Sequence, residues 1–177
     1  ERCAQIALAC FWKEKEALAR AKKLLAEAGY GPNNKPKVKI AISTSGSGQM
    51  LPLPMNEYVQ ENLNAVGFDA SFEVMEWNAL VTFAFQPATG DNAKKAGVNG
   101  VNISRALVDP YSGFTRLMNS AFVPPVGANW GILKDEKLDA MINKAHGSFD
   151  KAEQTKALSD VHSYIVDQAY WIWIAHD

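Results

Sequence analysis

The 177-residue sequence contains only two cysteines and three histidines, so few of its side chains are of the types that commonly bind metals. Cys3 and Cys10 have no histidine near them and supply at most half of a zinc site. If their segment is helical, their separation places them about 10 Å apart along the axis, too far for a disulfide. An extended or bent segment would let them pair. We expect no metal ion and no cofactor.

Long apolar runs and an excess of charge of one sign are also missing. No stretch approaches the roughly 18 consecutive apolar residues of a transmembrane helix, and the net charge is −1. Lysines gather at 13–23 and 35–39, but Glu14, Glu16 and Glu27 alternate with the first group, as is typical of the solvated face of a helix. The sequence therefore predicts no nucleic-acid partner, because binding one requires a basic patch.

Motifs for nucleotide binding or hydrolysis are absent as well. The loop "STSGSGQ" at 43–49 follows a strand, but it has neither a lysine nor the glycine spacing of a phosphate-binding loop. No G-x-S-x-G segment marks a nucleophilic serine. The histidines are not paired at metal spacing: His146, His162 and His176. His162 lies on or beside the apolar positions of its helix, which favours a core or boundary role.

Hydrophobic residues make up 47% of the chain, enough for one domain with a real core. Helical spacing and end signals predict helices over 14–28, 54–66, 78–86, 135–146 and from residues 109 and 150 onward. Alternating or continuous apolar residues predict strands over 37–43, 68–77, 98–104 and 169–175. Residues 86–97 and 119–131 are expected to be loops.

The first two strands and the helix between them predict a βαβ unit, with parallel strands and a right-handed crossover. The sequence as a whole predicts the α/β class, with an open mixed sheet flanked by helices and a single domain over residues 1–177.

Candidate binding residues lie where strands end, because open α/β sheets bind ligands beyond the carboxyl ends of their strands. Trp77 ends the second strand, and Asn129 and Trp130 lie in the second loop. Aromatic residues in such positions either line a pocket or serve local packing, and the sequence leaves both open. With no catalytic constellation beside them, these residues favour a binding module over an enzyme.

Five segments, in order, resemble those of family 5 extracellular solute-binding proteins, the dipeptide-, oligopeptide- and nickel-binding receptors of ABC importers. They are "ARAKKLLAEAGY" at 19–30, "YVQENLNAVGFDASFEVMEWNAL" at 58–80, "DPYSGFTRL" at 109–117, "NWGILKDEKLDAMINKA" at 129–145 and "FDKAEQTKALSDVHSYIVDQAYWIWIAHD" at 149–177. The resemblance covers residues 17–177, whereas 1–16 lack the family's usual Pro- and Tyr-rich approach.

The resemblance implies one lobe of a type II periplasmic-binding-protein fold, the second lobe of a two-lobed receptor that encloses a solute and presents it to an ABC permease. The first lobe would then be missing from this chain, and the parent protein would be exported to the periplasm or the extracellular face. A lone lobe should bind solute weakly or not at all. Two alternatives remain: a small α/β hydrolase that uses Ser43, Ser45 or Ser47, and a ligand-sensing or interaction domain that reuses the lobe.

The resemblance also implies which residues contact the solute. They follow the second and third strands and are Trp77, Asn78, Asn102, Ile103, Ser104, Arg105 and Ala106. Peptide-binding members place an aspartate before the Asp-Pro turn to pair with the peptide's ammonium group. Ala106 stands in that place, unless a small gap brings Asp109 there; otherwise Asp109 caps the next helix. The missing carboxylate argues against a standard peptide. Arg105 would favour a carboxylate or phosphate, or else be exposed or structurally paired.

Overall fold

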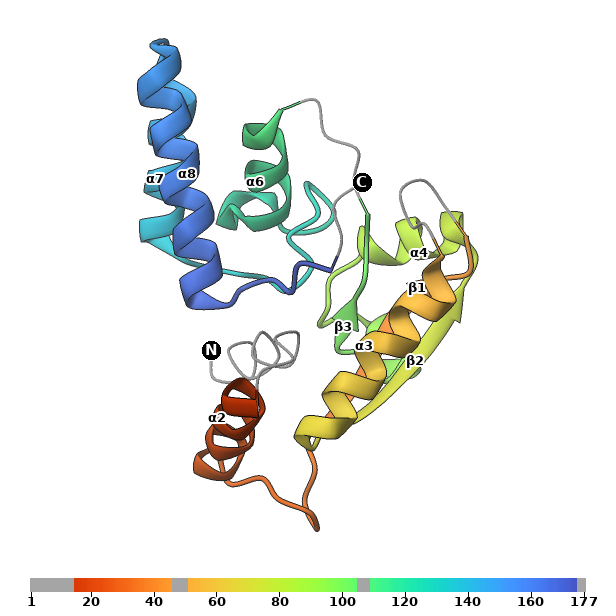
Figure 1. Cartoon of the computed structure of the whole chain (residues 1–177). Helices are drawn as coiled ribbons and strands as arrows, with labels where there is room; N and C mark the ends of the chain where they lie inside the picture. Colours follow the sequence, from red (N-terminus) through yellow and green to blue (C-terminus); the bar gives the residue numbers. More distant parts are fainter. Residues whose placement is uncertain (1–14, 46–50, 105–108, 175–177) are drawn as a thin grey trace.

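The computed structural model describes residues 15–45, 51–104 and 109–174 (Figure 1). Predictions that concern Cys3, Cys10, Arg105, Ala106 and residues 46–49 of the glycine-containing loop lie outside these ranges and stay predictions.

The sheet has three parallel strands, β1 (Lys37–Ser43), β2 (Asp69–Met75) and β3 (Gly100–Val101), in the order β2-β1-β3. β1 and β2 pair along their whole length, with Lys37 opposite Asp69 and Ser43 opposite Met75. This pairing confirms the predicted parallel unit. All pairing between the described strands is parallel, so the mixed sheet that the sequence predicted is not found among the described residues.

β3 is much shorter than the predicted strand 98–104, because only Gly100 and Val101 are paired with β1 as a strand. The side chain of Asn99 continues the pairing before the strand begins: its Oδ1 accepts from the Lys39 backbone N–H at 2.8 Å, and its Nδ2 donates to the Lys37 carbonyl at 2.9 Å. An amide side chain here takes the place of a backbone peptide group, since both offer one donor and one acceptor side by side.

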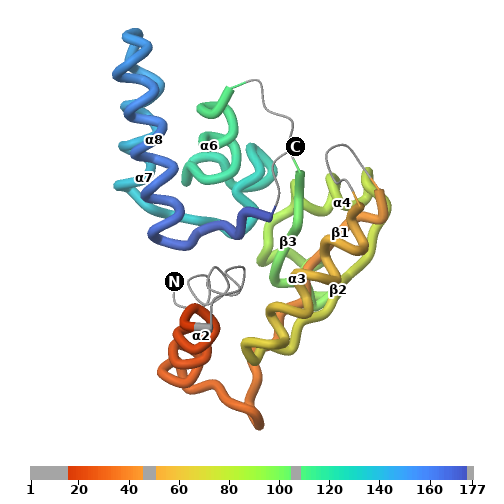
Figure 2. The backbone as a smooth tube through the Cα atoms, viewed as in Figure 1, coloured from red at the N-terminus to blue at the C-terminus, as the bar shows by residue number. Residues whose placement is uncertain are grey.

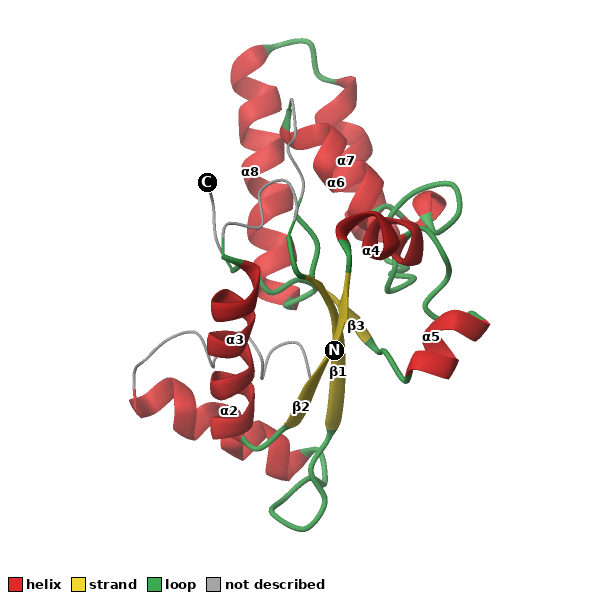
Figure 3. Ribbon diagram, turned by 90° about the vertical axis from the view of Figure 1, so that its right-hand side faces the viewer, coloured by secondary structure: helices red, strands yellow, loops and turns green. Residues whose placement is uncertain are grey.

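Two helices cover one face of the sheet, α2 (Lys15–Glu27) and α3 (Pro52–Val66) (Figure 3). Gly67 ends α3 with φ at 124°, a conformation that favours glycine. The buried residues between these helices and the sheet form what we call the first cluster: Ala21, Leu25, Val59, Leu63, Val66, Phe68 and Ala70. The predictions for both helices are confirmed to within two residues at each end.

The opposite face is covered by α4 (Trp77–Ala84) and α5 (Asp91–Ala96). Their buried residues form the second cluster: Ala41, Leu80, Phe83, Ala93 and Val98. The prediction of a loop over 86–97 is therefore wrong for its second half. Six residues are too few to show helical periodicity in the sequence. The last turn of α5 is held from the sheet, where the Lys39 ammonium donates to the Ala96 carbonyl at 2.8 Å.

A helical unit stands beside the sheet and consists of α6 (Pro110–Met118), the 3₁₀ turn η1 (Ser120–Phe122), α7 (Glu136–Gly147) and α8 (Lys151–Gln168) (Figure 2). Its buried residues form the third cluster: Leu117, Met118, Ala128, Leu138, Ile142, Val161 and Ile165. Asp109 caps α6 as predicted, because its Oδ1 accepts from the Ser112 N–H at 2.8 Å. His162 lies exposed on α8 and stacks on Trp173 with ring centroids 5.9 Å apart. No helix in the described ranges is long and apolar enough to cross a membrane.

The strand predicted over 169–175 is wrong for its described part. Ala169 has φ at 53° and ends α8, and residues 170–174 follow without strand pairing. Trp171 packs against the third cluster, while Ile172 and Ile174 pack against the first. The apolar run is buried between two cores rather than within a sheet, which the sequence pattern alone does not distinguish.

Candidate functional site

The carboxyl ends of the three strands meet at one edge of the sheet, because the strands are parallel. Ser43 and Met75 end β1 and β2 as partners, and Val101 ends β3 opposite Ala41. α4 begins two residues after the end of β2, at Trp77. The candidate residues that follow β2 and β3 are thereby brought to the same edge (Figure 1).

Glu76 fixes the start of α4. Its Oε2 accepts from the backbone N–H groups of Asn78 and Ala79 at 2.8 and 3.3 Å, as a capping carboxylate does. The Asn78 amide also donates to Oε1 of Glu76 at 3.3 Å, and Asn78 is exposed. Trp77 is half-buried and packs against the second cluster. The Glu-Trp pair at the end of β2 thus divides its work, with Glu76 capping the helix and Trp77 anchoring it.

Asn102 follows β3 and is held by two elements. Its backbone N–H donates to the Ala41 carbonyl of β1 at 2.9 Å, and its Nδ2 donates to Oδ1 of Asn56 on α3 at 2.6 Å. Asn56 is 1% exposed and donates to the Pro52 carbonyl at 2.7 Å. Sequence reasoning missed Asn56, although a polar residue among the apolar positions of α3 was a signal that could have found it.

Ile103 and Ser104 continue the chain from Asn102 and are both half-buried. The predicted contacts at Arg105 and Ala106 lie beyond the described part of this segment. The strand end is therefore placed as far as Ser104, two residues past the point at which its side chain is anchored to α3.

Asn129 and Trp130 serve packing within the described residues. Asn129 is 2% exposed; its Nδ2 donates to the Asn119 and Leu133 carbonyls at 3.2 and 2.8 Å, and its Oδ1 accepts from the Leu133 N–H at 2.9 Å. The Trp130 ring lies 5.9 Å from the Phe83 ring. Its Nε1 is buried, with no hydrogen-bond partner among the described residues. The sequence left pocket lining and local packing open, and these contacts are of the second kind.

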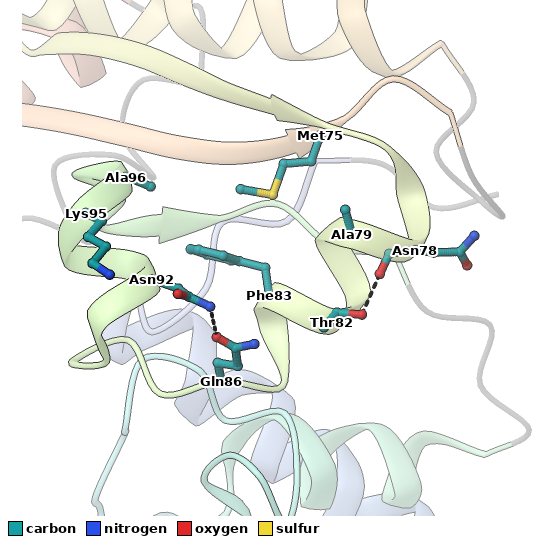
Figure 4. A pocket seen from close by; sticks show the side chains of 9 residues that line it. All are labelled: Met75, Asn78, Ala79, Thr82, Phe83, Gln86, Asn92, Lys95 and Ala96. Atoms are coloured by element: carbon teal, nitrogen blue, oxygen red, sulfur yellow. Dashed lines mark hydrogen bonds between the residues drawn. The ribbon is translucent and has the colours of Figure 1, made fainter.

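An open hollow of about 640 Å³ lies between α4 and α5, beside the end of β2 (Figure 4). Apolar side chains form part of its wall, and amides, a hydroxyl and one ammonium group form the rest. The lining residues are Met75, Asn78, Ala79, Thr82, Phe83, Gln86, Asn92, Lys95 and Ala96. Of the residues predicted to contact a ligand, only Asn78 takes part. Such a wall suits a small molecule that has both apolar and polar groups.

Asp135 has a perturbed pKa, but it lies at the start of α7 rather than at the strand edge. Burial raises the pKa of this carboxyl, and the hydroxyl of Tyr170, the Leu138 N–H, the hydroxyl of Tyr164 and the Lys137 N–H lower it; the net shift is downward. The two tyrosine hydroxyls donate to Oδ2 at 2.7 and 2.9 Å. Asp135 is a helix cap joined to a tyrosine pair, which explains its pKa without a catalytic role.

No three His, Cys, Asp or Glu side chains within 15–45, 51–104 and 109–174 are grouped so that they could hold a metal ion.

Comparison with known proteins places these features in a family. The family model for bacterial extracellular solute-binding proteins, family 5, middle region, matches residues 9–123. Di/tripeptide-binding protein 2 of Pseudomonas aeruginosa (strain UCBPP-PA14) is 26% identical over 160 residues, which are 89% of this chain and 28% of that protein.

Two solved structures show the same fold. An oligopeptide-binding protein of clavulanic acid biosynthesis superposes on 93% of this chain with a TM-score of 0.72 and 17% identity. A dipeptide-binding protein from Pseudoalteromonas sp. SM9913, in complex with Met-Leu, superposes on 85% of it with a TM-score of 0.69 and 22% identity. The chain spans 28% of the length of each of these relatives.

Proposed function

The chain belongs to family 5 of the bacterial extracellular solute-binding proteins, and we propose that it forms the second lobe of an ABC-importer receptor that captures a small polar or peptide-like solute between two lobes. Membership in a solute-binding family confirms the prediction that the chain is not an enzyme. Ser43, a nucleophile of the alternative hydrolase, is fully buried, and its hydroxyl donates to the Ser45 carbonyl.

The observation that carries this proposal is the convergence of the candidate residues at one sheet edge. Trp77 and Asn78 begin α4 directly after β2, and Asn102 to Ser104 follow β3. Ligands of open α/β sheets bind at such an edge, where loops and helix starts surround the strand ends. The overlap of 85–93% of this chain with 28% of longer receptors supports assignment to one lobe of a type II binding-protein fold.

The solute is proposed to be small and to carry neutral hydrogen-bond donors as well as a polar or acidic group. One relative is named for di- and tripeptides, and another was solved with Met-Leu. Ala106 offers no carboxylate to a peptide ammonium group, whereas Arg105 offers a cation to a carboxylate or phosphate. Both assignments rest on the family resemblance of residues 102–110.

The proposed mechanism is closure. A solute that touches both lobes stabilises the closed form over the open form by its differential affinity, and the permease recognises the closed form. The receptor would act in the periplasm or on the extracellular face, next to its membrane partner. A lone second lobe supplies only part of the contacts, so its affinity should be far below that of the complete receptor.

Calorimetry and thermal shift test the proposal. The complete receptor and the 177-residue chain are each titrated with the same library of dipeptides, tripeptides, sugars and opines. A ligand at about 100 times its Kd stabilises the complete receptor by about 2.7 kcal/mol. Tight binding by the chain alone, equal to that of the complete receptor, would contradict a divided site. The alternative of a sensor domain predicts a fused kinase or regulator instead of neighbouring permease and ATPase genes.

A further inference from the structure

The side chains of Asn56 and Asn102 form a chain of amides whose direction is fixed by its first acceptor. The carbonyl of Pro52 is an acceptor only, so Asn56 must turn its Nδ2 toward it, and the two atoms lie 2.7 Å apart. Oδ1 of Asn56 then faces Asn102. Asn102 must in turn present its own Nδ2, which lies 2.6 Å from that oxygen. The assignment of oxygen and nitrogen in both amides follows from this network.

The consequence for Asn102 is a fixed orientation of its carbonyl oxygen. Because Nδ2 is turned toward α3, Oδ1 lies on the other side of the amide group, and no donor from the described ranges reaches it. The residue is half-buried, and its backbone is tied to β1 through the Ala41 carbonyl at 2.9 Å. Rotation of the amide by 180° would bring two oxygens into contact at Asn56, so the flipped state is disfavoured.

We propose that Asn56 is a positioning residue that sets Asn102 as a hydrogen-bond acceptor for a neutral N–H group of the solute. This inference rests on the proposed function, and it adds a residue and a polarity that the proposed function does not contain. Asn56 itself is 1% exposed and touches no solute; it acts through Asn102. A neutral acceptor suits a peptide N–H, because the charged ammonium group of a peptide is better matched by a carboxylate.

The same helix contains a matched control. Asn62 donates its Nδ2 to the Tyr58 carbonyl at 2.7 Å, with the same four-residue spacing and the same distance as the bond from Asn56 to Pro52. Asn62 has no printed bond to the strand end that follows β3, unlike Asn56. A loss of the helix-internal bond alone therefore affects Asn56→Leu and Asn62→Leu alike, and any difference between them reports on Asn102.

The first arm of the test measures orientation by NMR on the chain without ligand. In the wild type, one side-chain amide proton of Asn102 should exchange slowly with solvent. In Asn56→Leu its exchange should accelerate by roughly tenfold or more, and in Asn62→Leu it should not change. If Asn56→Leu fails to fold, Asn56→Ala takes its place, since alanine suits a helix interior. Unchanged exchange in the Asn56 variant, or equal change in both variants, overturns the positioning role.

The second arm measures affinity in the complete receptor with Met-Leu and its depsipeptide analogue, in which an ester oxygen replaces the peptide N–H. The wild type should bind the depsipeptide roughly tenfold more weakly than the dipeptide. In Asn56→Leu that ratio should fall toward one, and in Asn62→Leu it should stay. A wild-type ratio near one overturns the acceptor role of Asn102. If the wild type binds no peptide at all, the peptide form of the proposed function and the acceptor role fail together, while the NMR arm still decides the positioning role.

Discussion

The ammonium nitrogen of Lys39 on β1 lies 2.6 Å from a carboxylate oxygen of Glu73 on the neighbouring strand β2. The same ammonium donates to the Ala96 carbonyl, in the last turn of α5, at 2.8 Å. One side chain thus joins both long strands to the short helix that covers them. Both partners of the ion pair are about one-third exposed, so solvent screens their attraction.

Replacement of Lys39 by methionine should lower the free energy of unfolding by about 1 kcal/mol, because it removes a partly screened ion pair and a helix-end hydrogen bond. Lys37→Met is the control, since Lys37 is exposed on the same strand and should change stability by less than about 0.5 kcal/mol. Urea denaturation measures both. An equal effect of the two substitutions would argue against the joining role of Lys39.

Gly127→Ala should destabilise the protein by about 2–3 kcal/mol through overpacking. A Cβ at position 127 would lie 2.4 Å from the carbonyl oxygen of Phe122 and 2.5 Å from its Cβ. That oxygen already accepts from the Asn129 N–H at 3.0 Å, so the loop that holds Asn129 and Trp130 would have to move. Gly131→Ala in the same loop is the control, because a Cβ there has no neighbour within 4 Å among the described residues. Similar losses in the two variants would contradict this account.

The lowered pKa of Asp135 predicts a contribution to stability that depends on pH. A carboxylate whose folded pKa lies below its unfolded value stabilises the fold above the unfolded value, and this contribution is lost as the pH falls through the folded value. Asp135→Asn should therefore be less stable than the wild type at pH 7, by about 1 kcal/mol for weakened bonds from Tyr164 and Tyr170.

Because the ordinary pKa of this carboxyl is 3.8, the difference between wild type and Asp135→Asn should shrink below about pH 4. Thermal unfolding at a series of pH values measures it. Asp167→Asn, at an exposed position on α8, serves as the control and should give a small difference at every pH. A difference that persists unchanged at pH 2 would show that Asp135 acts by packing rather than by charge.

If Asn78 contacts the solute, Asn78→Ala should weaken solute binding by the complete receptor by about tenfold with little loss of stability. The Asn78 side chain is exposed and makes one long bond to Glu76, at 3.3 Å, so its removal costs the fold little. Thr82→Ala, on the same wall of the hollow, is the control. Calorimetry that finds full affinity in Asn78→Ala would remove this residue from the proposed site.

The sequence predicted those elements whose formation depends on local patterns. β1 was predicted with its observed bounds, because its apolar residues alternate with lysines, and α6 was predicted from its Asp-Pro start. α5 was missed because its stability comes from outside its six residues, through the packing of Ala93 and the bond from Lys39 to Ala96. Local propensity contains no information about either contact.

The candidate site was predictable only as positions along the chain. The Glu-Trp ending of β2 and the segment after β3 are visible in the sequence, and parallel pairing brings them together. The partnership of Asn56 with Asn102 joins residues 46 positions apart and depends on how α3 lies over the sheet. Whether Asn129 faces a ligand or its own loop is likewise a question of packing, which residue type does not answer.

Residues 170–174 make the unfolding of the two halves interdependent. Ile172 and Ile174 fill gaps beside α2 and α3, while Tyr170 and Trp171, one step earlier on the same backbone, belong to the core of α7 and α8. Heat that loosens one core must pull apolar side chains out of the other. Calorimetry should therefore record one cooperative melting transition instead of two, and a protease that cuts between Trp171 and Ile172 should lower the melting temperature of both halves together.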